Sequence, residues 1–159
     1  MRRLRLYLET SVWNFYFADD APEKRDVTKE FFGNIKQGKY EIFISQTVLN
    51  EIDKADEPKK NQLMQLIKEH QPQGLDITSE VTDLSKEYIS QRIIPEAKVE
   101  DALHVATSTV YEMDALISWN NRHLANLYKM EKINSVNLKE GYTKHLEIIT
   151  PMEVISDED

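Results

Sequence analysis

Short runs of apolar residues alternate along the chain with longer segments in which apolar residues recur every three or four positions. Short apolar runs are typical of buried strands, and the longer spacing is typical of helices that bury one face. Helices are expected between the strands, with one more after residue 150. The pattern predicts strands at residues 4–8, 41–44, 75–78, 115–119 and 133–137.

Residues that can cap helices support several of these boundaries. Thr10 or Ser11 is placed to cap a short first helix through residues 13–17, and Ser45 and Ser79 precede later helices. A side-chain oxygen at such a position can accept a hydrogen bond from an unpaired N–H group of the first helical turn. We therefore predict that these hydroxyl groups begin helices.

Helices between successive strands favour a mostly parallel sheet, because each parallel connection has to cross back over a face of that sheet. We expect an α/β fold, specifically a three-layer α/β/α sandwich around a central sheet. Residues 1–155 are expected to form a single domain, followed by an acidic tail at residues 156–159.

The composition narrows the setting in which the protein works. Of the 159 residues, 40% are hydrophobic and 30% are charged, as in ordinary globular proteins. No apolar run approaches the length of a membrane span, and the absence of cysteine excludes disulfides and thiolate metal sites. We expect a cytoplasmic protein. Its net charge of −8 repels nucleic acid, so any binding to phosphate has to be local or mediated by a metal ion.

Oxygen-bearing side chains fall where a parallel sheet would collect them. Glu9 and Asn120 follow two predicted strands, Glu51 lies on the helix after a third, and Asp101 lies in the first turn of the helix that leads to a fourth. Ligands of such sheets bind beyond the carboxyl ends of the strands. Converging carboxylate and amide oxygens suit Mg²⁺ or Mn²⁺, which can activate water for phosphodiester cleavage.

Structural explanations compete with this interpretation. A chain with 28 acidic residues always has some at strand ends, and Asp101 with Glu100 could simply complement a helix dipole. His104, three residues after Asp101, could be a proton shuttle or a hydrogen-bonded structural histidine. His123 admits the same two roles. The side chains of Arg122, Lys129 and Lys132 could contact a phosphate backbone or form a solvated helix face.

Segments around these residues resemble the PIN-domain ribonucleases, specifically their VapC-like toxin branch. They are Tyr7-Leu8-Glu9-Thr10-Ser11-Val12, Val48-Leu49-Asn50-Glu51-Ile52, Glu100-Asp101-Ala102-Leu103-His104-Val105-Ala106 and Leu116-Ile117-Ser118-Trp119-Asn120. The resemblance implies an α/β/α sandwich that cleaves RNA endonucleolytically with Mg²⁺ or Mn²⁺. It also implies a homodimer and a cognate antitoxin protein as partners.

The same resemblance implies that Glu9, Glu51 and Asp101 are metal ligands, with Asn120 a ligand or a residue that positions water. Glu9 and Asn120 both stand where an aspartate is usual in the family. These departures keep a second hypothesis open, in which the protein is a catalytically weakened or inactive PIN-fold binding module. A third hypothesis is a phosphatase or flap-type nuclease built on a similar acidic rim.

Overall fold

The computed structural model describes residues 2–156 of the chain. This part contains a five-stranded sheet with the order β3-β2-β1-β4-β5, and every strand pairing in it is parallel. Of the acidic tail expected at residues 156–159, Ser156 is the last residue of a helix, and residues 157–159 lie outside the described residues. The strands are β1 (Leu4–Leu8), β2 (Tyr40–Ser45), β3 (Gln73–Leu75), β4 (Ala115–Ile117) and β5 (Glu147–Ile149).

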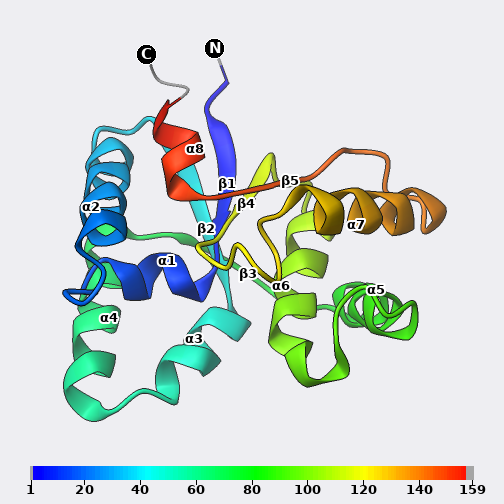
Figure 1. Ribbon diagram of the computed structural model, residues 1–159, viewed down its shortest axis with the longest axis horizontal. Coiled ribbons are helices and arrows are strands. Elements are labelled where there is room, and N and C mark those ends of the chain that lie inside the picture. Colours follow the sequence, from blue (N-terminus) through cyan, green and yellow to red (C-terminus); the bar gives the residue numbers. More distant parts are fainter. Residues whose placement is uncertain (1, 157–159) are drawn as a thin grey trace.

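Helices cover both faces of the sheet, so the expected three-layer α/β/α fold is confirmed (Figure 1). Helices α1, α2, α4 and α8 lie on one side of the sheet, α5, α6 and α7 lie on the other, and α3 lies below (Figure 1). The helices are α1 (Thr10–Phe15), α2 (Pro22–Lys36), α3 (Gln46–Asp53), α4 (Glu57–His70), α5 (Ser79–Ser90), the 3₁₀ helix η1 (Glu96–Lys98), α6 (Val99–Val110), α7 (Leu127–Lys139) and α8 (Pro151–Ser156).

Strand β1 is central, and its position explains its composition. Leu6, Tyr7 and Leu8 are buried because β1 pairs with β2 on one side and β4 on the other and is covered by helices on both faces. Trp13 of α1 is fully buried, with its ring 5.1 Å from that of Phe32 in α2. Burial of such large apolar side chains is the main favourable contribution to folding.

The fifth strand was placed wrongly from the sequence. Residues 133–137 belong to α7, and the strand is β5, Glu147–Ile149. Within α7, Ile133, Val136 and Asn137 are buried, at positions i, i+3 and i+4 of one helix face. The β-branched residues Ile133 and Val136 in a short polar stretch also suit a strand, and only the longer stretch reveals the helical spacing.

A buried asparagine helps to hold α7 in place. Asn137 Oδ1 accepts a hydrogen bond from the Tyr88 hydroxyl of α5 at 2.5 Å, and Asn137 Nδ2 donates to Thr109 Oγ1 of α6 at 3.0 Å. Burial raises the pKa of Tyr88, so this hydroxyl keeps its proton and remains a donor. The three helices of one layer are thus joined by a satisfied polar group inside the core.

Of the two serines predicted to cap α3 and α5, one does so and the other does not. Ser45 caps α3 as expected, because its side chain accepts from Thr47 N at 3.2 Å. Ser79 does not cap α5, since Thr78 Oγ1 accepts from Val81 N instead. The cap lies one residue earlier than predicted, and β3 is Gln73–Leu75 rather than residues 75–78. No helix in residues 2–156 combines the length and apolar character that crossing a membrane requires.

Candidate metal centre at the carboxyl end of the sheet

The candidate site lies where the strand order of the sheet changes direction. From β1 the chain adds β2 and β3 on one side, whereas β4 and β5 pair on the other side. The helical connections therefore diverge next to β1 and β4, and in open α/β sheets the carboxyl end of this switch point is the crevice in which ligands bind. Glu9 directly follows β1, and Ser118 directly follows β4.

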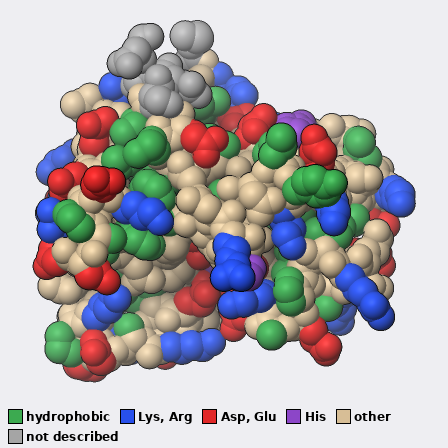
Figure 2. Space-filling model, viewed as in Figure 1, with side chains coloured by type: hydrophobic (Ala, Val, Ile, Leu, Met, Phe, Trp, Pro, Cys, Tyr) green, Lys and Arg blue, Asp and Glu red, His purple; other side chains and the backbone are tan. Residues whose placement is uncertain are grey.

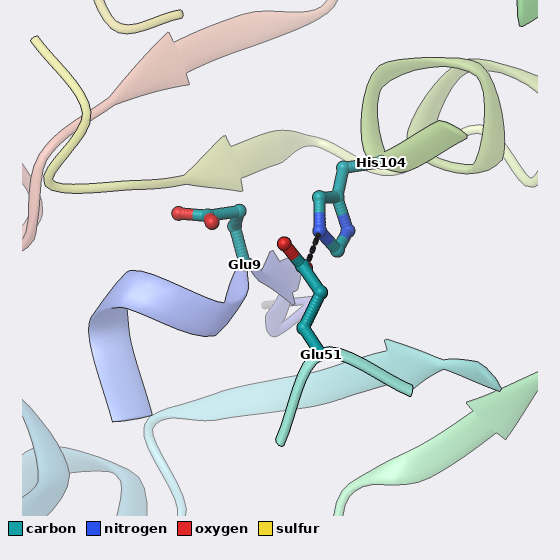
Figure 3. A group of neighbouring side chains, drawn as sticks. All are labelled: Glu9, Glu51 and His104. Carbon is teal, nitrogen blue, oxygen red and sulfur yellow. Dashed lines mark hydrogen bonds and ion pairs between the residues drawn. The ribbon is translucent and has the colours of Figure 1, made fainter. Parts of the chain in front are cut away.

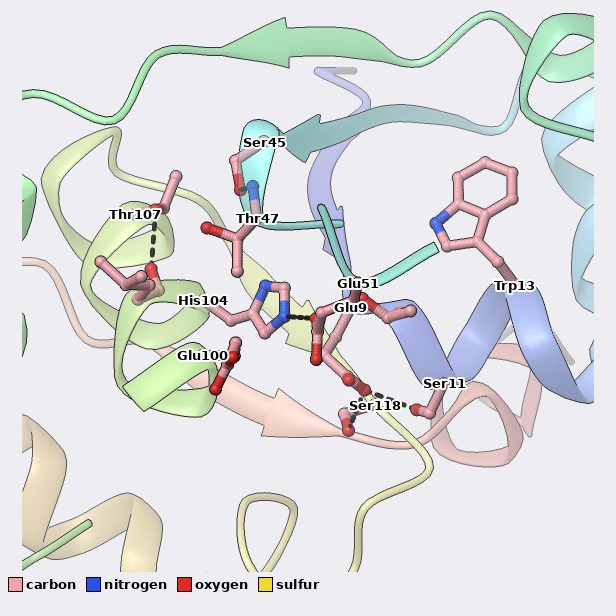
Figure 4. A network of polar contacts seen from close by, with 12 residues as sticks. Glu9, Ser11, Trp13, Ser45, Thr47, Glu51, Glu100, His104, Thr107 and Ser118 are labelled. Atoms are coloured by element: carbon pink, nitrogen blue, oxygen red, sulfur yellow. Dashed lines mark hydrogen bonds and ion pairs between the residues drawn. The ribbon is translucent and has the colours of Figure 1, made fainter. Parts of the chain in front are cut away.

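Glu9 is a buried carboxylate with only 5% of its surface exposed. Its Oε1 accepts hydrogen bonds from Ser11 Oγ at 2.5 Å and from Ser118 Oγ at 2.7 Å, as Figure 4 shows. Ser118 Oγ also accepts from Asn120 N at 2.9 Å, and Ser11 Oγ accepts from Trp119 N at 2.9 Å. The two serines therefore hold one oxygen of Glu9 and join it to the segment after β4.

These contacts correct the expected roles of Thr10 and Ser11. Both residues lie inside α1, and the residue at its N-cap is Glu9, which makes no side-chain capping bond. Thr10 and Ser11 instead donate to the carboxylates of Glu51 and Glu9. The first turn of α1 thus supplies hydroxyl donors to two acidic residues that come from different elements.

Glu51 extends from α3 toward the same crevice. Its Oε1 accepts from Thr10 Oγ1 at 2.6 Å and lies 2.6 Å from Nε2 of His104. Burial opposes ionisation of Glu51, but the hydrogen bonds from His104 and Thr10 and the positive charge of Lys54 outweigh it, so the pKa of Glu51 is lowered. Glu51 is therefore ionised at neutral pH.

His104 of α6 is fully buried behind Glu51. Its Nδ1 lies 2.6 Å from the hydroxyl of Tyr7, which in turn lies 2.6 Å from Ser45 Oγ. Burial works against protonation of the ring, but the hydrogen bond to Glu51 and the negative charges of Glu9, Glu51 and Asp101 raise the pKa of His104. Burial also raises the pKa of Tyr7, so its hydroxyl remains protonated.

The structure brings Glu9, Glu51 and His104 into one group (Figure 3). One ligand atom from each residue lies within 4.8 Å of the other two. Across residues 2–156, the hydrogen bonds to both carboxylates fall on Oε1, and no buried side-chain oxygen lacks a partner. The Oε2 atoms of Glu9 and Glu51 are therefore accessible to solvent and free to bind a cation.

Asp101 lies near this group but outside it. Burial, followed by the negative charge of Glu9, raises the pKa of Asp101 to about 6, while Lys98 acts in the opposite direction. Within the described residues its carboxylate makes no hydrogen bond to the protein, so its oxygens are also open to solvent. A buried carboxylate beside two others is unfavourable in the metal-free protein, and a bound cation would relieve that repulsion.

Asn120 begins a turn after β4. Its Oδ1 accepts a hydrogen bond from the backbone N–H of His123 at 3.0 Å, and its own N–H donates to Ser118. Through Ser118, Asn120 is connected to Glu9. His123 takes part in this turn through its backbone N–H, which donates to Asn120.

Cationic side chains surround the acidic crevice despite the negative net charge of the chain. Lys54 of α3 pairs with Glu100 of α6 at 3.2 Å, and the charges of Lys98 and Lys129 act on Asp101. Lys129 also donates to the carbonyl of Ile93. Figure 2 shows Lys and Arg side chains near the centre of the face in view.

Three hydroxyl-bearing residues that the sequence does not identify as site residues make hydrogen bonds in the site: Tyr7, Ser45 and Ser118. Each lies in or directly after a strand whose carboxyl end faces the crevice. Strand position alone was therefore an available signal, but hydroxyl-bearing residues at strand ends are common, and only their three-dimensional contacts reveal which ones matter.

By sequence, no family model and no curated protein matches the chain. Comparison of the structure does give matches. A crystal structure of VapBC2 from Rickettsia felis bound to a DNA fragment from their promoter is 17% identical over 92% of this chain and 98% of that chain, with a TM-score of 0.55. A DNA-bound VapBC from Salmonella typhimurium is 13% identical over 93% and 98%, with a TM-score of 0.56.

The class that the fold and site define is a parallel α/β/α domain with acidic side chains at the strand-order reversal. Within that class, the chain has a VapC-like PIN-domain fold, since both matches span nearly all of it. The resemblance found in the sequence is thereby confirmed for the fold. At identities of 17% and 13%, the likeness shows the fold alone.

Proposed function

We propose that the protein is a metal-dependent endoribonuclease, the toxin of a toxin–antitoxin pair. The observation that supports this most directly is the convergence of Glu9 and Glu51 within 4.8 Å at the carboxyl end of the sheet, each with one oxygen open to solvent. Asp101 adds a third carboxylate, which is buried like that of Glu9, and its pKa is raised by burial and by the charge of Glu9. A generic α/β domain has no need of two buried acids and a half-buried one at the same end of its sheet.

The donor set fits a hard divalent cation. Carboxylate oxygens favour Mg²⁺ or Mn²⁺, and the chain offers no thiolate ligand because it lacks cysteine. Glu9, Glu51 and Asp101 would hold the ion, with Asn120 as a further ligand or as a residue that orients water. A bound ion would supply charge neutralisation and a water molecule of lowered pKa.

The residues of the chain itself position the carboxylates and the substrate. Ser11 and Ser118 fix Glu9, while Thr10 and His104 fix Glu51, so both acids are held before any ligand arrives. Such preorganisation reduces the cost of ordering the site during the reaction. Lys98 and Lys129, on the Asp101 side, are placed to offset the negative charge of an RNA backbone.

Cleavage of labelled RNA by the purified protein tests this function. We expect cleavage with Mn²⁺ that EDTA abolishes, and we expect Asp101→Asn to lose it while Asp83→Asn, at an exposed position of α5, retains it. RNA that stays intact with every divalent ion would instead support the inactive binding module. Cleavage of a DNA flap, but not of RNA, would support the third hypothesis.

Partners are tested separately. Two of the matched structures are of VapBC assemblies, which supports an antitoxin as the partner of this chain as well. We expect a small protein encoded beside this gene, with a DNA-binding N-terminus, to co-purify with the chain and suppress cleavage. We expect the chain alone to be a homodimer by light scattering. A neighbouring protein that neither binds nor inhibits would contradict the toxin role while leaving the nuclease intact.

A further inference from the structure

A line of buried hydrogen bonds runs behind the two carboxylates. It leads from Thr47 N to Ser45 Oγ (3.2 Å), to the Tyr7 hydroxyl (2.6 Å), to His104 Nδ1 (2.6 Å), and from His104 Nε2 to Glu51 Oε1 (2.6 Å). The residues come from α3, β2, β1 and α6. Figure 4 shows Ser45, Thr47, His104 and Glu51 in this arrangement. Tyr7 and His104 are fully buried and Ser45 is 1% exposed, so water does not compete for these bonds.

One end of the line fixes the direction of every hydrogen bond in it. The backbone N–H of Thr47 can only donate, so Ser45 Oγ accepts there. In residues 2–156 the remaining partner of Ser45 is the Tyr7 oxygen, and the Ser45 proton therefore points to it. Tyr7 must then donate to His104 Nδ1. An Nδ1 that accepts leaves the imidazole proton on Nε2, facing Glu51 Oε1.

Other placements of the proton leave a buried group unsatisfied. A proton on Nδ1 would turn the Tyr7 proton toward Ser45, and the buried Ser45 proton would then have no acceptor. A neutral ring with its proton on Nδ1 would also bring the Nε2 lone pair against a carboxylate oxygen. Buried polar groups in folded proteins are nearly always paired, which favours the first arrangement.

We propose that His104 is a positioning residue for Glu51 rather than a metal ligand. Its Nε2–H, together with the Thr10 hydroxyl, occupies Oε1 of Glu51 and so directs Oε2 toward the cation. A nitrogen that carries this proton has no lone pair for a metal, although the atom lies within the 4.8 Å group. The part of the inference that concerns the cation rests on the proposed function, whereas the placement of the proton does not.

The placement of the proton can be measured in the intact, metal-free protein. Nitrogen-15 NMR of the histidine rings, followed as the pH is raised past the elevated pKa of His104 until its ring is neutral, distinguishes the two tautomers and the charged ring. We expect His104 to be neutral with its proton on Nε2. We expect Tyr7→Phe, which removes the donor to Nδ1, to shift the Nδ1 resonance while the proton stays on Nε2, where Glu51 still accepts it. A proton on Nδ1 in the neutral ring of the wild-type protein would overturn the inference.

The positioning role is tested by two substitutions that differ in reach. The amide of His104→Gln can place an N–H near the position of Nε2, whereas His104→Asn reaches only as far as Nδ1. We expect Gln to keep the Mn²⁺ Kd within about 3-fold of wild type, and Asn to weaken it by on the order of 10-fold or more. Calorimetric titration measures both, and thermal melting confirms that each variant is folded.

The outcomes separate this inference from the proposed function. Equal losses of Mn²⁺ affinity in His104→Gln and His104→Asn would overturn the role of the Nε2–H, because donor position would then not matter. Wild-type protein that binds no Mn²⁺ would overturn the cation part together with the proposed metal site. A wild-type protein that binds Mn²⁺ but carries the His104 proton on Nδ1 would overturn this inference alone.

Discussion

Ser118 Oγ donates to Glu9 Oε1 at 2.7 Å and so connects the carboxyl ends of β4 and β1. The two strands are neighbours in the sheet, although their sequences are more than 100 residues apart. Ser118 also accepts from the N–H of Asn120, which makes one hydroxyl the connection between two of the candidate ligands. The candidate site therefore depends on the pairing of β1 with β4 and not only on the acidic residues themselves.

Ser118→Ala should loosen Glu9. The change removes one of two donors to Glu9 Oε1 and leaves the Asn120 N–H without its partner, so we expect Mn²⁺ affinity to fall by about 3- to 10-fold and stability by about 1 kcal/mol. Calorimetry and urea unfolding measure the two effects. Ser85→Ala is the matched control, because Ser85 is equally buried but donates only within α5. A loss of affinity in both variants would contradict a specific role for Ser118.

Asp101→Asn should stabilise the metal-free protein while abolishing its response to metal. The pKa of Asp101 is about 6 in the folded protein against an ordinary value of 3.8, so the folded state binds this proton more tightly than the unfolded state. The free energy of unfolding of the wild type therefore decreases as the pH rises from about 4 to about 6, and it stays lower above that range. Removing the charge should add about 1–3 kcal/mol above about pH 6 and little near about pH 4.

Urea unfolding at the two pH values, without metal, measures this difference. Addition of Mn²⁺ should then raise the melting temperature of wild type but not that of Asp101→Asn. An asparagine variant that is less stable than wild type at neutral pH would argue that Asp101 makes a favourable contact in the folded protein. That result would remove the electrostatic argument for a cation at this position.

Asn120→Asp should strengthen metal binding. An aspartate can still accept the hydrogen bond from His123 N, so the turn after β4 is kept, and the rim gains a negative charge. We expect the Mn²⁺ Kd to fall by about 3- to 10-fold at low ionic strength, and the gain to shrink as salt is added. Calorimetry at two salt concentrations measures it, with Asn121→Asp as the control for charge alone. Equal gains in both variants would show that the effect is not specific to position 120.

Asp114 should contribute to stability but not to the site. Its carboxylate accepts from the Arg2 guanidinium, from Arg5 N at 2.8 Å and from Lys144 Nζ at 2.8 Å, and these contacts, that of Arg2 foremost, hold the pKa of Asp114 far below its ordinary value. A lowered pKa means that the stabilisation is present above about pH 4 and is lost as the pH falls further. We expect Asp114→Asn to cost about 1–2 kcal/mol at neutral pH, after allowance for solvent screening.

Chemical unfolding across the pH range tests this expectation, with Mn²⁺ affinity measured alongside. Asp114 lies after α6 and before β4, at the amino end of the sheet, so Mn²⁺ affinity should stay unchanged. A change in affinity without a change in stability would contradict the separation between this ion-pair cluster and the carboxylate crevice.

Local patterns in the sequence were sufficient for most of the architecture. The nearly continuous apolar run at residues 4–8 indicated a buried strand, and the spacing of Phe31, Phe32 and Ile35 indicated a helix with one buried face. The same patterns could not assign residues 133–137 to a helix or residues 147–149 to a strand. Short segments of mixed polarity fit both a helix and a strand, and contacts with neighbouring elements decide between the two. In α7, the contacts of Asn137 with Tyr88 and Thr109 made that selection.

The sequence by itself determined the α/β class and the position of acidic residues near strand ends, since both follow from spacing along the chain. Only the tertiary structure decided that Glu9 and Glu51 face each other, that His104 stands between Glu51 and Tyr7, and that Asp101 lies just outside their group. These relationships are set by strand order and helix packing, which join residues far apart in sequence. Side-chain hydrogen bonds across those elements then select which oxygens remain free for a cation.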